Sequence, residues 1–288
     1  MTRVLSALVL IPVVVGVIWF LPPIATLILA EVAALLAFIE YAELARALGV
    51  EIPRVIAGAA VLATLATFAN TAVLPGTMWG GDLHVVPRDV AGLDIALLSV
   101  MIVIGCAAVA TRTPGPRVLQ DTAAAVLPVF YIAVPLGALV AIRMLRGGRP
   151  ALMLLLVVIV VSDSAQYYTG RLFGRHPLSP AISPKKTIEG AIGGLILGTG
   201  AFVLGSLRIF PFLPELLWLF LVPMGVMVVA AGMVGDLFES LLKRSAGVKD
   251  SSGLIPGHGG VLDRIDSWLF AAPIYYVFVR YLAQGYVP

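Results

Sequence analysis

The chain has 288 residues, of which 60% are hydrophobic and only 12% are charged, and its mean hydropathy is +1.04. Soluble domains carry about 25% charged residues, so the composition excludes an ordinary soluble domain and predicts an all-α, polytopic integral membrane protein. The net charge of +3 comes from cations spread singly through the predicted loops, so we expect no nucleic-acid partner. The single cysteine, Cys106, excludes an intrachain disulfide and a cysteine-rich metal site.

Apolar segments of the length that crosses a bilayer, about 20 residues in a helix, recur along the chain. We expect about nine transmembrane helices, with kinks in the fifth, where Pro128 and Pro135 remove backbone donors. The predicted spans lie near residues 4–21, 24–48, 55–74, 95–110, 122–142, from 152, 191–205, 213–234 and 268–281. No soluble domain or clear repeat is visible, so we expect a single membrane-embedded domain over 1–288.

Three carboxylates lie within the second predicted span. Glu40 and Glu43 are three residues apart and share a helix face, and Arg46 follows one turn after Glu43. The predicted role of this pair is an interfacial ion pair near the helix end. Glu31 lies deeper in the span, and its role is left open.

Two polar segments, over 163–190 and 235–267, interrupt the apolar pattern. With the N-terminus in the cytoplasm, most lysines and arginines fall on the cytoplasmic side, as the positive-inside rule requires, although a cluster at Arg143, Arg146 and Arg149 does not. Both polar segments share one side wherever the seventh and eighth spans form a hairpin. We therefore expect a polar cavity that faces the cytoplasm.

The second polar segment combines carboxylates and cations. If the eighth helix continues past residue 235, Asp236, Ser240 and Lys243 lie on one helix face, at i, i+4 and i+7, with Glu239 beside them. Such a set suits a metal-bound phosphate. Carboxylate ligands without His or Cys pairs favour Mg²⁺ over zinc. Further polar residues of the segment are Lys249, Asp250, His258, Asp263, Arg264 and Asp266.

A glycine-rich loop, SSGLIPGHGG, separates the two charged parts of this segment. Its backbone amides can approach an anion closely. His258 could hydrogen-bond a phosphate or simply brace the loop, and both interpretations stay open. Asp263 and Asp266 follow at a spacing of three, which places both carboxylates on one side of the last helix.

The first polar segment begins with Asp163, which lies at the end of ten consecutive apolar residues. Burying an unpaired charge there is costly, so we expect a functional role, and the alternative is an interfacial cap that pairs with Arg171. The segment S-P-K-K-T at 183–187 precedes a predicted helix, with Thr187 as its N-cap. A helix N-terminus together with Lys185 and Lys186 offers an anion site, although the two lysines could also serve only to fix the topology.

The stretch from Ser240 to Asp266 resembles the signature of phosphatidate cytidylyltransferases, also called CDP-diacylglycerol synthases. It reads S-L-L-K-R-S-A-G-V-K-D-S-S-G-L-I-P-G-H-G-G-V-L-D-R-I-D. The fixed positions of S-x-apolar-K-R, four residues, K-D, then H-G-G-apolar-x-D-R-apolar-D are all present. The elements G-D-L at 235–237, S-P-K-K-T-x-E-G at 183–190 and the stretch around Asp163 are also similar to the family, although the order S-A-Q-Y at 164–167 departs from its pattern.

This resemblance implies transfer of the cytidylyl group of CTP to phosphatidic acid, giving CDP-diacylglycerol and pyrophosphate in phospholipid biosynthesis. It implies Mg²⁺, accompanied by a monovalent cation such as K⁺, with Asp236 and Asp263 as metal ligands. The implied catalytic residues are Asp236, Asp263, Lys243 and Lys249. The expected substrate-binding residues are Ser183, Lys185, Lys186, Thr187, Asp163, Ser240, Arg244, Asp250, His258, Arg264 and Asp266.

The resemblance further implies a homodimer in the inner (plasma) membrane, with N-terminal helices over about 1–142 and catalytic helices and loops over about 150–288. One alternative is a related CTP-dependent enzyme that acts on another lipid phosphate or lipid alcohol. A second is an ion-coupled transporter, because intramembrane carboxylates and kinked helices also occur in carriers. The concentration of polar residues in two segments at one face, away from the bilayer midplane, favours the enzyme.

Overall fold

The protein was analysed as a computed structural model, which describes residues 2–70, 88–211, 215–254 and 259–283. Almost all of this part of the chain is helical, so the prediction of an all-α protein is confirmed. The elements are α1 (Thr2–Phe20), α2 (Pro23–Ala47), α3 (Arg54–Asn70), α4 (Arg88–Thr111), α5 (Val118–Pro128), η1 (Val129–Ala133), α6 (Val134–Met144), α7 (Gly148–Phe173), β1 (Pro177–Ser179), β2 (Ser183–Thr187), α8 (Ile188–Ile209), α9 (Glu215–Ser245), α10 (Leu262–Val277) and η2 (Phe278–Ala283).

Six helices of the described part are long and apolar enough to cross a membrane. They cover Pro23–Ala47, Gly92–Thr111, Val118–Met144, Gly148–Phe173, Ile188–Ile209 and Leu219–Ser245. The predicted third and ninth spans correspond to shorter helices, since the apolar part of α3 is Arg54–Ala69 and α10 has only 16 residues, whereas α1 has 19 residues, of which Ile11–Phe20 have described side chains. The predicted number of about nine spans is therefore not confirmed.

Proline shapes the fifth predicted span. The helix α5 ends at Pro128, the π-helical turn η1 follows, and α6 begins at Val134 with Pro135 in its first turn. Because proline has no backbone N–H and its ring clashes with the preceding turn, regular hydrogen bonding cannot run through this point. The irregularity lies at the predicted position and takes the form of a wider helical turn.

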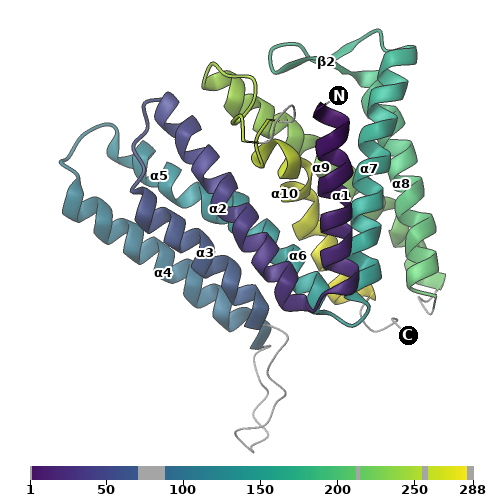
Figure 1. Cartoon of the computed structure of the whole chain (residues 1–288), viewed down its shortest axis with the longest axis horizontal. Helices are drawn as coiled ribbons and strands as arrows, with labels where there is room; N and C mark the ends of the chain where they lie inside the picture. The colour runs from purple at the N-terminus through teal and green to yellow at the C-terminus, as the bar shows by residue number, and fades with distance from the viewer. Residues whose placement is uncertain (1, 71–87, 212–214, 255–258, 284–288) are drawn as a thin grey trace, which may run out of the picture.

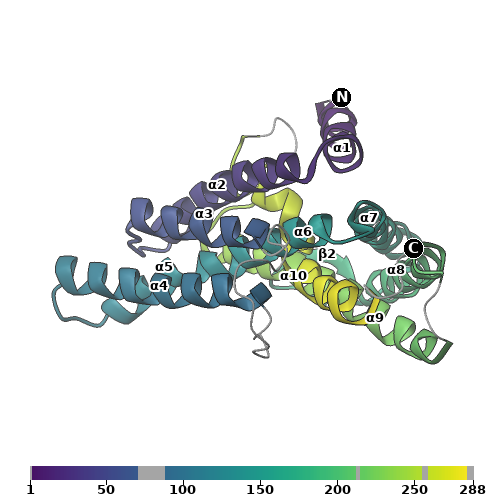
Figure 2. The same cartoon turned by 90° about the horizontal axis from the view of Figure 1, so that it is seen from below.

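Two apolar clusters form the core. One is built on α7, α8, α9 and α10, where Leu155, Phe202 and Tyr275 are fully buried, and the other on α2, α3 and the α5–α6 segment, around Leu65 and Ile132. Figures 1 and 2 place α6 and α10 between a flank formed by α3 and α4 and a flank formed by α7 and α8. The central helix α10 thus connects the two clusters.

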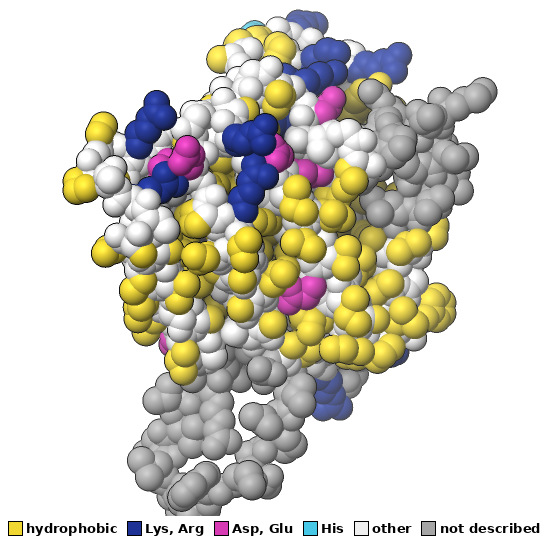
Figure 3. Space-filling view, turned by 60° about the vertical axis from the view of Figure 1, so that its left-hand side comes forward, with side chains coloured by type: hydrophobic (Ala, Val, Ile, Leu, Met, Phe, Trp, Pro, Cys, Tyr) yellow, Lys and Arg dark blue, Asp and Glu magenta, His cyan; other side chains and the backbone are white. Residues whose placement is uncertain are grey.

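Charged side chains gather at one end of the helices, whereas hydrophobic side chains cover much of the flank (Figure 3). The hairpin of β1 and β2, the end of α7 and the start of α10 lie at this polar end (Figure 1). In the hairpin, Pro177 pairs with Thr187 and Ser179 with Ser183. Thr187 also caps α8, because the backbone N–H of Gly190 donates to its Oγ1 at 3.1 Å, which confirms the predicted N-cap.

Candidate active site

A cavity of about 570 Å³ opens among α7, the hairpin, α8, α9 and α10 at the polar end. It is lined by side chains from both polar segments of the sequence. Among the predicted site residues it includes Asp163, Lys185, Lys186, Thr187, Asp236, Lys243, Asp250, Asp263, Arg264 and Asp266. The two polar segments therefore meet in one cavity that carries both signs of charge.

Four other predicted site residues within the described part of the chain do not line this cavity. Ser183 and Ser240 are partly buried, and Lys249 is exposed. Arg244 lies outside the cavity and donates to the backbone carbonyls of Ile182 and Val248. His258 lies outside the described residues. The part of the signature that reaches the cavity is thus carried by Lys243, Asp250 and the residues at the start of α10.

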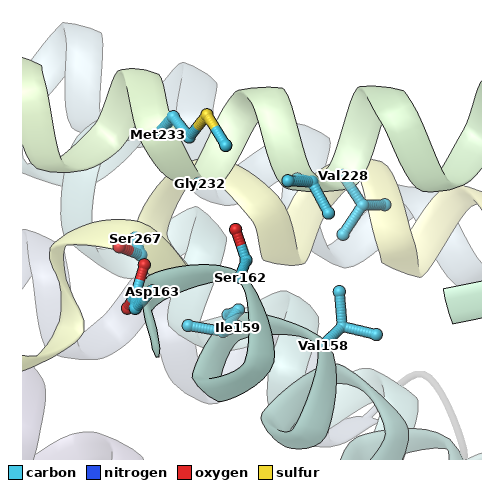
Figure 4. A pocket seen from close by; sticks show the side chains of 9 residues that line it. Val158, Ile159, Ser162, Asp163, Val228, Gly232, Met233 and Ser267 are labelled. Carbon is cyan, nitrogen blue, oxygen red and sulfur yellow. The ribbon is translucent and has the colours of Figure 1, made fainter. Parts of the chain in front are cut away.

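A smaller cavity of about 10 Å³ lies between α7 and α9 (Figure 4). Its walls are mostly apolar, with Val158 and Ile159 on α7 facing Val228 on α9. Asp163 and Ser267 line both this cavity and the larger one. Asp163 therefore lies at the boundary between the polar cavity and the apolar helix packing beneath it, as its position after an apolar run predicted.

An ion pair between Lys186 and Asp236 joins the hairpin to α9. The ammonium of Lys186 contacts the carboxylate of Asp236, but the contact does not have the geometry of a hydrogen bond. The side chains of Lys186 and Asp236 are 23% and 32% exposed, but the ammonium nitrogen of Lys186 is itself buried. The hairpin, which the sequence analysis described only as a segment that precedes a helix, thus places the ammonium of Lys186 beside the carboxylate of Asp236 on α9.

Lys243 contacts two carboxylates, those of Glu239 and Asp263. Glu239 is one turn before Lys243 on α9 and is fully buried, and the exposed fractions of the Lys243 and Asp263 side chains are 11% and 5%. A buried charge is tolerated when an opposite charge compensates for it. Lys243 is therefore the shared counterion of two buried carboxylates, a role that the sequence analysis did not predict.

Asp263 organises the glycine-rich loop. Its Oδ2 accepts hydrogen bonds from the backbone N–H of Gly260 at 2.7 Å and from the N–H and Oγ of Ser251 at 3.0 and 2.9 Å, and its Oδ1 contacts Lys243. Burial alone would raise the pKa of Asp263, but these hydrogen bonds stabilise the charged form and lower the pKa to about 2. Gly259 has a φ of +80°, and a Cβ there would collide with Asp263. The position therefore requires glycine, both for its left-handed backbone conformation and for its lack of a side chain.

Asp266 is a partly buried acid of the cavity. Burial, followed by the negative charge of Asp236, raises the pKa of Asp266 to about 7, and Asp163 adds to this rise. The close approach of α9 to α10 brings Asp236 and Asp266 together. Gly235 permits that approach, because a Cβ at this position would overlap the backbone carbonyl of Asp266.

The carboxylates differ in their capacity to hold a hard cation. No group of three or more His, Cys, Asp or Glu side chains in residues 2–70, 88–211, 215–254 and 259–283 is already arranged as a metal site. Both oxygens of Asp263 are occupied by donors, whereas Asp236 contacts one lysine and Asp266 accepts one hydrogen bond, from the N–H of Ser267. Asp236 and Asp266 repel each other, and a cation between them would relieve that repulsion. Mg²⁺ binds oxygen ligands such as carboxylates, so these two residues could hold it.

Glu40 is buried near the site, whereas the sequence analysis assigned it to an interfacial ion pair. Its side chain is only 4% exposed and accepts hydrogen bonds from the loop and the start of α10. Glu43 makes the surface ion pairs instead, with Arg54 at 2.8 Å and Arg46 at 3.7 Å. The prediction was wrong for Glu40 and is confirmed for Glu43, because the two side chains leave α2 toward different neighbours.

The model of the cytidylyltransferase family matches residues 1–282 of the chain. The chain is similar to a phosphatidate cytidylyltransferase of Helicobacter pylori, strain J99, at 44% identity over 55% of this chain and 57% of that protein. It is also similar to the phosphatidate cytidylyltransferase of Bacillus subtilis, strain 168, at 34% identity over 65% of this chain and 68% of that protein.

A third relative is a protein of Escherichia coli, strain K12, named uncharacterized protein YnbB, with 42% identity over 48% of this chain and 45% of that protein. Apart from the Bacillus subtilis protein, the chain spans about half the length of these curated relatives. The family match covers far more of the chain than any of these pairwise similarities.

Proposed function

Because the chain belongs to the cytidylyltransferase family, we propose that it transfers the cytidylyl group of CTP to phosphatidic acid, forming CDP-diacylglycerol and pyrophosphate. The observation that carries this proposal is the cavity of about 570 Å³, in which lysines, two arginines and carboxylates converge at the polar end of apolar helices. A nucleotide from the aqueous phase and the headgroup of a membrane lipid can meet at such a position.

The reaction requires positioning and charge compensation more than proton transfer. An oxygen of the phosphatidate phosphate attacks the α-phosphorus of CTP, a phosphorus–oxygen bond forms, and the bond to the leaving pyrophosphate breaks. The nucleophile is already an anion, so no strong general base is needed. Lys185, Lys186 and Arg264, which line the cavity, bind the phosphates and stabilise the charge that develops on them.

A divalent cation is part of this proposal. Asp236 and Asp266 would hold it, because they lie close together and keep oxygens free of donors, and the predicted ligand Asp263 would join them only if Lys243 releases its Oδ1. Mg²⁺ bound there would neutralise negative charge on the triphosphate. The accompanying K⁺ stays a prediction from the family resemblance.

We also propose that the protein lies in the inner (plasma) membrane with the cavity facing the cytoplasm. The positive-inside distribution of lysine and arginine supports this orientation. Only the family resemblance supports a homodimer, and crosslinking of the protein in membranes would test it. A cytoplasmic cavity is required by the chemistry, because CTP is supplied from that side.

The purified protein, incubated with phosphatidic acid, Mg²⁺ and CTP labelled at the α-phosphate, should yield labelled lipid, and CTP labelled at the γ-phosphate should not. Asp236→Asn should lower this activity by about 100-fold or more, because the cation that would neutralise the triphosphate loses a charged ligand. Chelation of the divalent cation should abolish product formation. Label transfer from the γ-phosphate would instead indicate a lipid kinase.

Asp94→Asn is the matched control. Asp94 is an exposed aspartate of α4, which does not line the cavity, so its substitution should leave the activity unchanged. Near-normal activity of Asp236→Asn, at equal protein amount, would contradict the assignment of the site.

A further inference from the structure

We propose that Glu40, on the N-terminal helix α2, is a positioning residue that holds the glycine-rich loop and the start of α10 in the geometry of the active site. This inference rests on the proposed function, because it concerns the residues assigned to that site. Glu40 itself does not line the cavity. It acts through Ser251 and Asp263.

All four hydrogen bonds of the Glu40 carboxylate go to one short region of the chain. Oε1 accepts from Ser252 Oγ at 2.7 Å and from the backbone N–H of Val261 at 2.9 Å. Oε2 accepts from the backbone N–H of Leu262 at 2.8 Å and lies 2.9 Å from Ser251 Oγ, whose single proton it shares with Asp263 Oδ2. One buried side chain of α2 therefore binds both ends of the loop.

Two of these donors belong to the N-terminus of α10. The first backbone N–H groups of a helix have no acceptor within the helix, and its N-terminus favours a nearby negative charge. Val261 occupies the N-cap position of α10 and provides no side-chain acceptor. Glu40 thus supplies from α2 the negatively charged acceptor that the local sequence of α10 lacks.

The hydrogen bonds continue from Glu40 to the cavity. The Ser251 hydroxyl lies 2.9 Å from Glu40 Oε2 and 2.9 Å from Asp263 Oδ2, and Asp263 in turn contacts Lys243. Gly260 has no room for a Cβ, because Ser251 Oγ and both carboxylate oxygens of Glu40 occupy that space. A displacement of the Glu40 carboxylate is therefore transmitted to Asp263 and Lys243, which do line the cavity.

The test compares Glu40→Gln with Glu43→Gln in the full-length protein, using CTP and phosphatidic acid as substrates. Glutamine keeps the size of the side chain but replaces one acceptor oxygen by an NH₂ group, which donates. That group would face the N–H and O–H donors that bind the carboxylate in the wild type. We expect kcat to fall about 10- to 100-fold, as small misplacements of catalytic groups do. Glu43 pairs only at the surface, so its variant should stay within about twofold of the wild type.

A double variant separates positioning from a general structural role. If Glu40 acts through Ser251, Glu40→Gln combined with Ser251→Ala should be no slower than the slower single variant, since coupled residues are not additive. Loss equal to the product of the two single losses would overturn the inference. Wild-type rates in Glu40→Gln would overturn it as well.

A milder variant covers the case in which Glu40→Gln does not accumulate. Ser252→Ala removes one of the four hydrogen bonds and should slow the reaction about threefold to tenfold. An unchanged rate there would refute the inference. If the wild-type protein forms no lipid product from CTP, the proposed function fails, and the inference about Glu40 fails with it.

Discussion

Replacement of Lys243 by methionine should destabilise the protein, because it leaves two buried carboxylates without their shared counterion. Glu239 is fully buried, and the Asp263 side chain is 5% exposed. Removing one partner of a buried ion pair costs about 3 to 5 kcal/mol of the free energy of unfolding. For a chain of this size that loss lowers the melting temperature by roughly 6 to 20 °C.

A second substitution distinguishes the loss of compensation from the loss of packing. Lys243→Met combined with Glu239→Gln also removes one of the two buried charges, and should recover part of the lost melting temperature, because Asp263 keeps its hydrogen bonds from Gly260 and Ser251. The activity should stay low in both variants, because neither has the ammonium group of Lys243 that lines the cavity. The assays are thermal unfolding in detergent and formation of labelled lipid from CTP.

The reasoning would be refuted if Lys243→Met melted at the wild-type temperature, since a buried carboxylate would then be stable without a counterion. It would also be refuted if the double variant were no more stable than the single one. The first outcome would mean that the contacts of Lys243 with Glu239 and Asp263 contribute nothing to folding, and the second that the loss does not come from an uncompensated charge on Glu239.

Two further substitutions test the local packing. Gly235→Ala should cost about 1 to 3 kcal/mol of unfolding free energy and reduce activity, because a Cβ there separates α9 from the backbone of Asp266; Gly200→Ala, on α8 with open space around it, is the control, and equal melting temperatures would contradict the prediction. Thr187→Ala should cost about 0.5 to 2 kcal/mol through loss of the α8 cap, whereas Thr187→Ser should restore it, as thermal unfolding would show.

Features that depend on neighbouring residues were readable from the sequence. Thr187 caps α8 as predicted, because an N-cap requires only a suitable side chain three residues before an N–H donor. Asp236 and Lys243 both line the cavity, as their helical spacing indicates. Glu43 pairs with Arg46 for the same local reason.

Features that depend on tertiary contacts could not be read from the sequence. Glu40 receives donors from residues more than 200 positions later in the chain, and no local pattern encodes such a contact. The available signal was that Glu40 lies one turn deeper than Glu43, where Arg46 is too far along the helix to compensate for both. The hairpin before α8 was missed because its strands of three and five residues contain prolines and lysines in place of an alternating apolar pattern.

The ion pairs of the cavity connect nucleotide binding to metal binding. Lys186 contacts Asp236 and Lys243 contacts Asp263, so two cations suited to phosphate are paired with two carboxylates suited to a metal. The proposed divalent cation, bound to Asp236, would compete with Lys186 for that carboxylate and so release the ammonium for a phosphate. Binding of the cation and binding of the triphosphate would then favour each other through Lys186, as coupling between two sites requires.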